Sequence, residues 1–163
     1  MQATRKTLKI AHSVASAGLI GGLGCAMVLL SVGETASVAG YAELRASLAA
    51  ISKWVLIPSM GLAVVSGLFA MVVHQPFTQM GWAWAKAALG ILMFKGVLHV
   101  DGLVADHAAA VSRRIAEGAA EAAVLREAVG HEWGMLWVVM ALSVANVVLG
   151  VWRPRKRAAR AAA

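Results

Sequence analysis

The residues of this 163-residue chain that could carry chemistry are polar side chains set within long apolar runs. His12, Lys86 and Asn146 each lie inside such a run, and His74 closes another. A charged side chain at the centre of a bilayer costs about 3 kcal/mol on insertion scales. Each of these residues therefore predicts either a functional site or a route by which its polar end reaches water.

These four side chains fall near one end of the expected helices when about 1.5 Å is counted for each helical residue. Every Asp and Glu lies elsewhere, in residues 34–43 and 101–132. Lys86 therefore either extends its ammonium to the nearby membrane surface or meets an anion that the protein does not supply, such as a propionate, a phosphate or a quinone oxygen. We predict a cofactor-binding site of His12, Lys86, His74 and Asn146. Interfacial or helix-packing roles for His12 and Lys86 are the alternative.

A second polar group lies toward the opposite end of the expected helices and contains His99, His107 and His131. Imidazole is a common metal ligand, but this spacing matches no specific metal motif such as His-Glu-x-x-His. A metal site at these three histidines and an ordinary solvated rim therefore both stay open. The chain has no nucleophile elbow, no phosphate-binding glycine loop and no paired carboxylates in its apolar runs, so whether it is an enzyme is also open.

The composition places all of these residues in an integral membrane protein. Hydrophobic residues make up 60% of the chain and charged residues 14%, and the mean hydropathy is +0.74. Soluble domains are about 45–50% apolar and about 25% charged, and a soluble domain of this size could not bury so much apolar surface. The lone Cys25 cannot form an intrachain disulfide.

Four apolar runs, residues 10–32, 54–73, 82–103 and 133–152, are long enough to cross about 30 Å of hydrocarbon. The sequence therefore predicts an all-α, integral membrane four-helix bundle that forms one domain over residues 1–163, with a basic, alanine-rich tail at 153–163. Between the third and fourth spans, apolar residues recur at helical spacing and predict an amphipathic external helical segment, broken near Gly118 or Gly130.

Two further features predict how the helices pack. Gly18 and Gly22 form a small-xxx-small pattern that lets a neighbouring backbone approach the first span. Pro58 frees a carbonyl one turn earlier in the chain and predicts a kink near Trp54.

The basic residues predict the orientation of the bundle. Eight Lys and Arg residues lie at the two ends of the chain, against five in the segments expected between spans on the other side. This surplus places both termini of the multi-pass chain in the cytoplasm, with the anionic inner leaflet of the bilayer as a partner. A cleaved signal peptide is the alternative for the first run, which is longer than such peptides require. No nucleic-acid motif accompanies the net charge of +7, so we expect no nucleic-acid partner.

The chain resembles the small four-span bacterial membrane proteins of unknown function that are grouped with copper-resistance protein D and the HemJ-type protoporphyrinogen oxidase. The matching stretches cover all four spans and lie at residues 8–12, 54–58 with 66–67, 81–86 and 151–154.

HemJ-like proteins carry a histidine early in the first span and a Trp-x-His-x-Lys pattern that opens the third, and they bind haem b. His12 matches the first feature, and Trp82 and Lys86 match the ends of the second, whereas Trp84 stands at the position of the second histidine. The resemblance implies haem b bound through His12, with Lys86 as the partner of a propionate. The departure at Trp84 argues against protoporphyrinogen oxidation.

The sequence thus favours a small inner-membrane protein that binds haem b or another lipid-soluble ligand near the cytoplasmic side of the bundle. A non-catalytic accessory subunit of a larger membrane complex, or a homo-oligomer, is the alternative, supported by the glycine surface of the first span. A third hypothesis is copper or other cation handling at the periplasmic side by His99, His107 and His131. Lys95 faces away from Lys86 on the expected third span, and the sequence leaves open which surface it occupies.

Overall fold

The computed structural model describes residues 2–33, 38–73, 75–99, 105–118 and 122–152, and no strand occurs among them. The predicted all-α fold is confirmed for these residues. The helices are α1 (Gln2–Gly33), α2 (Val38–Ile51), the π-helical turn η1 (Ser52–Leu56), α3 (Ile57–Val73), the 3-10 turn η2 (Gln75–Gln79), α4 (Gly81–His99), α5 (Ala105–Ala116) and α6 (Ala122–Trp152).

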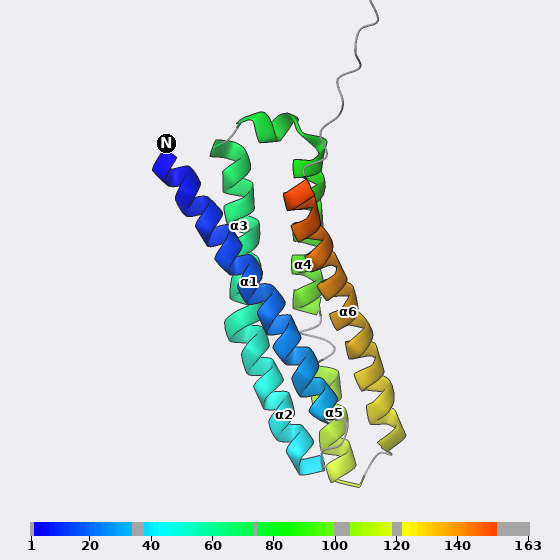
Figure 1. Ribbon diagram of the computed structural model, residues 1–163. Helices are drawn as coiled ribbons and strands as arrows, with labels where there is room; N and C mark the ends of the chain where they lie inside the picture. The colour runs from blue at the N-terminus through cyan, green and yellow to red at the C-terminus, as the bar shows by residue number, and fades with distance from the viewer. Residues whose placement is uncertain (1, 34–37, 74, 100–104, 119–121, 153–163) are drawn as a thin grey trace, which may run out of the picture.

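The long helices run lengthwise beside one another (Figure 1). The helices α2, η1 and α3 form one continuous rod that packs along α1, and α4 packs against α3 and α6. The N-terminus of α1, the turn η2 and the last residues of α6 lie at one end, which we call the termini end. The short helix α5 packs against α2 and α6 at the other end, which we call the α5 end.

Three segments are long and apolar enough to cross a membrane, namely Ala3–Val32, Glu43–Val73 and Glu132–Trp152. They contain the first, second and fourth predicted spans. The third predicted span, residues 82–103, corresponds to α4, which ends at His99; residues 100–103 lie outside the described part of the chain. Because α4 carries Lys86 and Lys95 within 19 residues, it is less apolar than the other three.

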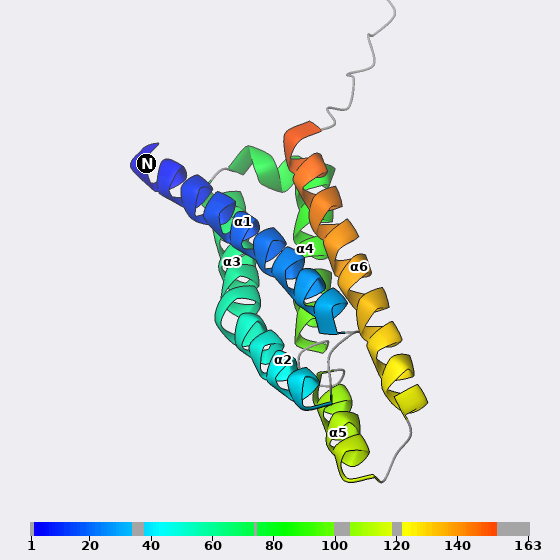
Figure 2. The ribbon, with the colours of Figure 1, turned by 60° about the horizontal axis from the view of Figure 1, so that its bottom comes forward.

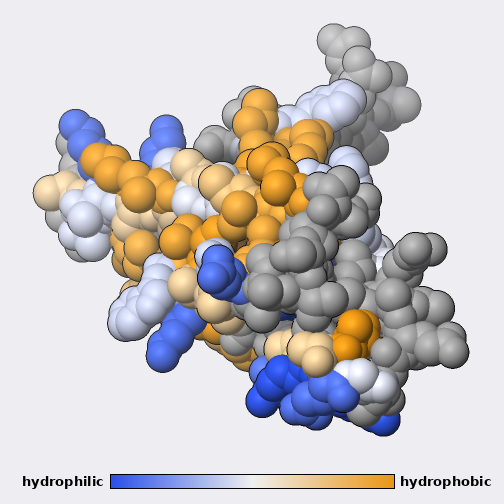
Figure 3. Space-filling model, turned by 90° about the horizontal axis from the view of Figure 1, so that it is seen from below, coloured by the Kyte–Doolittle hydropathy of each residue, from blue (hydrophilic) through white to orange (hydrophobic). Residues whose placement is uncertain are grey.

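The outer surface of the bundle is rich in large apolar side chains. Ile10, Trp54, Phe69, Leu92 and Trp137 are each more than half exposed. In a soluble bundle the apolar stripe of each helix faces the core and polar residues face water. Hydrophilic residues instead gather toward the ends of the bundle, with exposed Arg5 and Lys9 at the termini end and a cluster along the lower edge of Figure 3, which views the α5 end. This distribution fits a bundle whose sides contact lipid.

The tightly packed core lies toward the middle and the α5 end of the bundle. Leu23, Leu30, Met60 and Met93 are almost completely buried, and they join one cluster with residues of α6 such as Leu136. The halves of α1 and α6 nearer the termini contribute less to this core. Space therefore remains between the helices at the termini end.

Close packing of α1 on the α2–α3 rod depends on the predicted small-xxx-small pair. A Cβ atom at Gly18 would lie 2.7 Å from Oγ of Ser59, and one at Gly22 would lie 2.7 Å from Cδ2 of Leu56. A side chain at either position would have to displace Ser59 or Leu56, so the glycine pair allows α1 and the rod to pack closely.

The distortion predicted from Pro58 occurs as the turn η1. Proline has no N–H to donate to the carbonyl four residues earlier, and a π turn absorbs the mismatch because its hydrogen bonds span five residues. Accordingly, the N–H of Ile57 donates to the carbonyl of Ser52. Figure 2 shows the rod bending where α2 meets α3.

The break predicted between the third and fourth spans lies at Gly118, and the alternative at Gly130 is wrong. Gly118 has a φ of +71°, and its N–H donates to the carbonyl of Ile115 at 3.0 Å. Glycine adopts this left-handed conformation without the steric penalty of a Cβ atom, which makes it the usual residue at a helix end of this kind. Gly130 lies inside the continuous helix α6.

A buried ion pair joins α2 to α6 near the α5 end and was not predicted from the sequence. Nη1 of Arg45 lies 2.5 Å from Oε2 of Glu132, and both residues are about 5% exposed. Separated by 87 positions in the chain, the two residues give no local signal of their pairing. The contact fixes the position of α6 against the α2–α3 rod.

Replacing Gly22 with Leu should lower the stability of the bundle by about 1–3 kcal/mol, the usual range for overpacking. The added side chain would meet Leu56, whereas Gly21 has nothing within 4 Å of its Cβ position. The thermal midpoint of detergent-purified protein measures the effect, with Gly21→Leu as the matched control. Equal midpoints for the two variants would contradict this account of the packing.

Breaking the buried ion pair from one side should be more damaging than removing it. We expect Arg45→Met alone or Glu132→Leu alone to cost about 3–5 kcal/mol, because each leaves an uncompensated buried charge. The double variant Arg45→Met/Glu132→Leu should recover most of that loss. Urea or thermal unfolding of the four proteins gives the coupling free energy, and simple additivity of the two losses would show that the residues do not stabilise each other.

Candidate functional site

A cavity of about 390 Å³ lies between α1, α3, α4 and α6 at the termini end of the bundle. Small-molecule sites typically measure about 300–1,000 Å³ and combine an apolar wall with a few polar groups. The wall here is mostly apolar, with Met60, Val64, Leu68, Met71 and Met93 among its residues. Its polar members are Arg5, Lys9, His12, Ser16, Lys86, Ser143 and Asn146.

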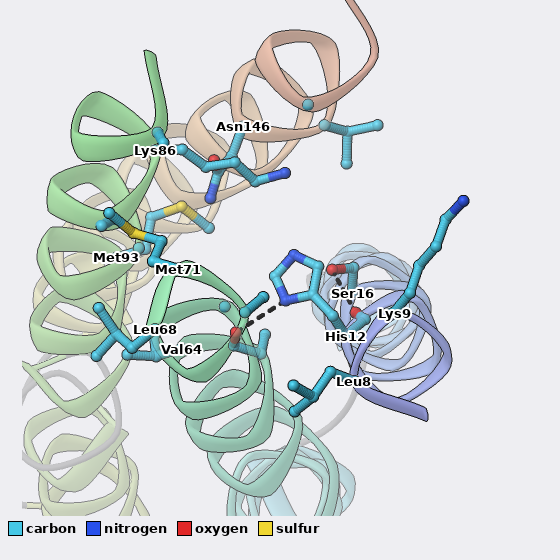
Figure 4. A pocket seen from close by; sticks show the side chains of 18 of the residues that line it. Leu8, Lys9, His12, Ser16, Val64, Leu68, Met71, Lys86, Met93 and Asn146 are labelled. Atoms are coloured by element: carbon cyan, nitrogen blue, oxygen red, sulfur yellow. Dashed lines mark hydrogen bonds between the residues drawn. The ribbon is translucent and has the colours of Figure 1, made fainter. Parts of the chain in front are cut away.

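His12 is held on one side of this cavity by the backbone of α3. Its Nδ1 lies 2.9 Å from the carbonyl oxygen of Ala63. A carbonyl only accepts hydrogen bonds, so Nδ1 carries a proton, and in the neutral form of the ring Nε2 carries the lone pair. Figure 4 shows the second ring nitrogen pointing into the cavity. The structure therefore presents an imidazole of fixed orientation whose Nε2 faces the cavity.

Small residues on α3 allow this approach of the imidazole. A Cβ atom at Gly67 would lie 3.5 Å from Cε1 of His12, in van der Waals contact, so a side chain longer than that of alanine would meet the ring. Ser66 donates its hydroxyl to the carbonyl of Leu62 at 2.6 Å. Its oxygen lies 3.2 Å from Nδ1 of His12 and can accept a share of the same proton.

Lys86 reaches the cavity from α4 and lies against α6. A Cβ atom at Gly150 would lie 2.5 Å from its Nζ, so the ammonium lies directly against the backbone of α6 at this glycine. Figure 4 shows Lys86 beside Asn146, across the cavity from His12. Three of the four residues predicted to form one site thus line one cavity, and the fourth, His74, lies outside the described residues.

The charged groups around the cavity are all cationic. Arg5, Lys9 and Lys86 line it, and no acidic residue of the described chain does. The eight Asp and Glu residues fall in residues 34–43 and 101–132, and those that the structure describes lie toward the α5 end. Such a cavity favours a ligand with an apolar body and an anionic group. Arg5 and Lys9 belong to the eight terminal cations from which the sequence predicts membrane orientation, and the sequence did not predict that they line a site.

Asn146 contributes a buried acceptor to the same cavity. Its Oδ1 is buried and has no hydrogen-bond partner within the described residues. An unsatisfied buried polar group costs about 1–3 kcal/mol, and a donor supplied by a ligand or a water molecule would remove that cost. The nearby hydroxyl of Ser143 differs in this respect, because it donates to the carbonyl of Val139 at 2.7 Å.

Most of the second predicted site, at His99, His107 and His131, lies outside the described side chains. His99 is exposed at the end of α4, and the side chains of His107 and His131 lie outside the described part. Within that part, no group of three His, Cys, Asp or Glu residues lies close enough to hold a metal ion. Lys95 is exposed on the outer surface of α4 and does not line the cavity.

Replacing Asn146 with Leu should raise the stability of the ligand-free protein by about 1–3 kcal/mol, because it removes an unsatisfied buried acceptor. Ser143→Ala is the control, since its hydroxyl is already satisfied and its loss should not stabilise the bundle. Thermal unfolding of the ligand-free variants measures both effects. A destabilised Asn146→Leu protein would mean that the amide has a structural partner.

A comparison of the chain with family models, with curated protein sequences and with solved structures finds no match. The resemblance to the HemJ-like proteins therefore stays a prediction, and the site must be interpreted from its own geometry.

Proposed function

We propose that this chain is a four-pass protein of the bacterial inner membrane that binds haem b in the cavity at the termini end, with His12 as the iron ligand. The observation that carries the proposal is the fixed imidazole of His12. Ligating histidines usually donate their other ring N–H to a carbonyl or carboxylate, which sets the tautomer and the orientation of the ring. The bond from Nδ1 to the carbonyl of Ala63 has this form.

The rest of the cavity suits the same cofactor. Haem b needs an apolar slot for the porphyrin and cationic partners for two propionates. The apolar wall meets the first need, and Lys86 with Arg5 and Lys9 meets the second. When bound, haem b would supply one-electron chemistry. The chain's own residues would orient it, neutralise its acidic groups and exclude water from its faces.

The position that departs from the HemJ pattern supports binding without protoporphyrinogen oxidation. Trp84 is 57% exposed, and its Nε1 donates to the carbonyl of Thr78 at 2.9 Å. It lies outside the cavity lining. No second histidine joins His12 among the described lining residues.

The proposed topology adds α4 to the three apolar spans. Its 19 residues rise by about 28 Å, which is close to the thickness of the hydrocarbon core. Lys86 and Lys95 lie near its two ends, within reach of the two membrane surfaces. The surplus of terminal cations places the termini end in the cytoplasm, and α5, with Arg113 and Arg114 exposed, then lies in the periplasm.

A second candidate function is that of an accessory subunit in a larger membrane complex. Gly21 and Gly24 have nothing within 4 Å of their Cβ positions and border a shallow apolar surface with Cys25, Val28 and Ile51. Outward glycines let a partner helix approach closely. Purification from native membranes without a stoichiometric partner would count against this function.

The haem proposal predicts that His12→Ala will weaken binding of ferric haem by more than about 100-fold. The loss of a group that only supports a metal ligand through a hydrogen bond typically costs about 10–100-fold, and removal of the ligand itself should cost more. Lys86→Met should weaken it by about 10–100-fold, through loss of a charge-assisted bond of about 1.5–3 kcal/mol. Titration of detergent-purified protein, followed by oxidised and dithionite-reduced spectra, measures both.

Ser16→Ala is the matched control in the same wall. The hydroxyl of Ser16 donates a hydrogen bond to the backbone carbonyl of His12 at 2.8 Å, so its loss should have little effect on ligand binding. A b-type haem spectrum that persists unchanged in His12→Ala would overturn the proposal.

A further inference from the structure

Three sides of the cavity are closed by direct contacts between neighbouring helices. His12 ties α1 to α3 through the carbonyl of Ala63. Val64 of α3 packs on α4, where a Cβ atom at Gly90 would lie 3.6 Å from it. Lys86 of α4 lies against Gly150 of α6. The helices therefore form two pairs at this end, α1 with α3 and α4 with α6, and α3 joins α4.

The fourth side, between α1 and α6, is different. The buried residues of α1 begin only at Ala15, and those of α6 end at Ser143. Both helices contribute to the common core through residues nearer the α5 end, such as Leu23 and Leu136. Figures 1 and 2 agree that α1 and α6 run side by side there and separate toward the termini. The cavity, which is not enclosed, lies where they separate.

The two edges of this opening differ in chemistry along their length. Ile20 of α1 and Val147 of α6, the two helices that separate here, both line the cavity and are apolar. Farther toward the termini end, the α1 edge carries Arg5 and Lys9, both exposed. Figure 4 shows the side chain of Lys9 extending away from His12. An apolar gap with cations at its end matches the layering of a leaflet, with hydrocarbon below anionic headgroups.

We infer that the opening between α1 and α6 is a lateral entrance, through which the ligand passes from the cytoplasmic leaflet into the cavity. The inference rests on the proposed function for its topology and for its ligand class, an amphiphile with an apolar body and acidic groups. The body passes between Ile20 and Val147 without crossing water. Arg5 and Lys9 meet the acidic groups at headgroup level, and Lys86 meets them inside.

A cysteine placed on the far wall tests the entrance without any cofactor. Ala87 of α4 lines the cavity, and Ala85 of the same helix is exposed and does not. Full-length protein carrying Ala87→Cys in a Cys25→Ser background, reconstituted in liposomes, is treated with a long-chain alkyl maleimide dissolved in the bilayer. A membrane-impermeant sulfonated maleimide, applied to both faces, is the comparison.

The lipid-dissolved reagent is expected to label Ala87→Cys at least about 10 times faster than the sulfonated one. Adding Ile20→Trp with Val147→Trp, which fill the opening, should slow this labelling about 10-fold and leave Ala85→Cys unaffected. The control pair Val14→Trp with Val144→Trp alters exposed residues outside the cavity lining and should change neither rate by more than about twofold. Faster labelling by the sulfonated reagent, or no effect of the filled opening, would overturn the lateral entrance.

Uptake of ferric haem from donor vesicles separates this inference from the proposed function. The variant Ile20→Trp/Val147→Trp should slow the appearance of the bound-haem spectrum about 10-fold and leave the final spectrum unchanged. His12→Ala should instead change the final spectrum. If wild-type protein gives no haem spectrum but shows the expected cysteine pattern, the haem proposal fails and the entrance stands for another amphiphile. A normal haem spectrum with unchanged uptake rates would overturn the entrance alone.

Discussion

The hydrogen bond from the imidazole of His12 to the carbonyl of Ala63 is the contact on which the proposed site depends. It holds α1 against α3 at the termini end, uses the Nδ1 proton and leaves Nε2 facing the cavity. In apolar surroundings a histidine without such a partner would carry a full desolvation cost. The same bond thus stabilises the local packing and prepares a nitrogen for a ligand.

Charge is separated along the bundle, and this separation gives the cavity its character. The described acidic residues lie toward the α5 end, where Glu132 is used in a buried pair with Arg45. The cavity at the termini end has cations and no described carboxylate. A negatively charged ligand is therefore electrostatically matched to this end. The buried Oδ1 of Asn146 in addition favours a ligand that carries a hydrogen-bond donor.

Packing explains why the cavity exists at all. Gly18 and Gly22 bring α1 close to the α2–α3 rod near the middle of the bundle, and the core around Leu23 closes the half nearer the α5 end. Toward the termini, α1 follows α3 and α6 follows α4, so the two pairs diverge (Figures 1 and 2). The space between them is a consequence of which helices contact each other.

Much of this architecture follows from the sequence because it rests on local or additive properties. Apolar run lengths determine the long helices, Pro58 determines the distortion before α3, and Gly18 and Gly22 mark a face that can approach a neighbour closely. Counting about 1.5 Å for each helical residue also places His12, Lys86 and Asn146 at a similar depth in the membrane. The expected break could not be assigned between Gly118 and Gly130, because both are glycines and only Gly118 adopts a positive φ.

The tertiary structure decided the contacts between residues far apart in the chain. The pairing of Arg45 with Glu132, the carbonyl of Ala63 as partner of His12 and the space left by Gly150 for Lys86 all depend on helix rotation and neighbour order. Helical periodicity limits which residues share a face, but it does not say which helix that face meets. The sequence alone therefore determined the kind of protein and the level of the site, and packing decided its walls, its fixed imidazole and its open side.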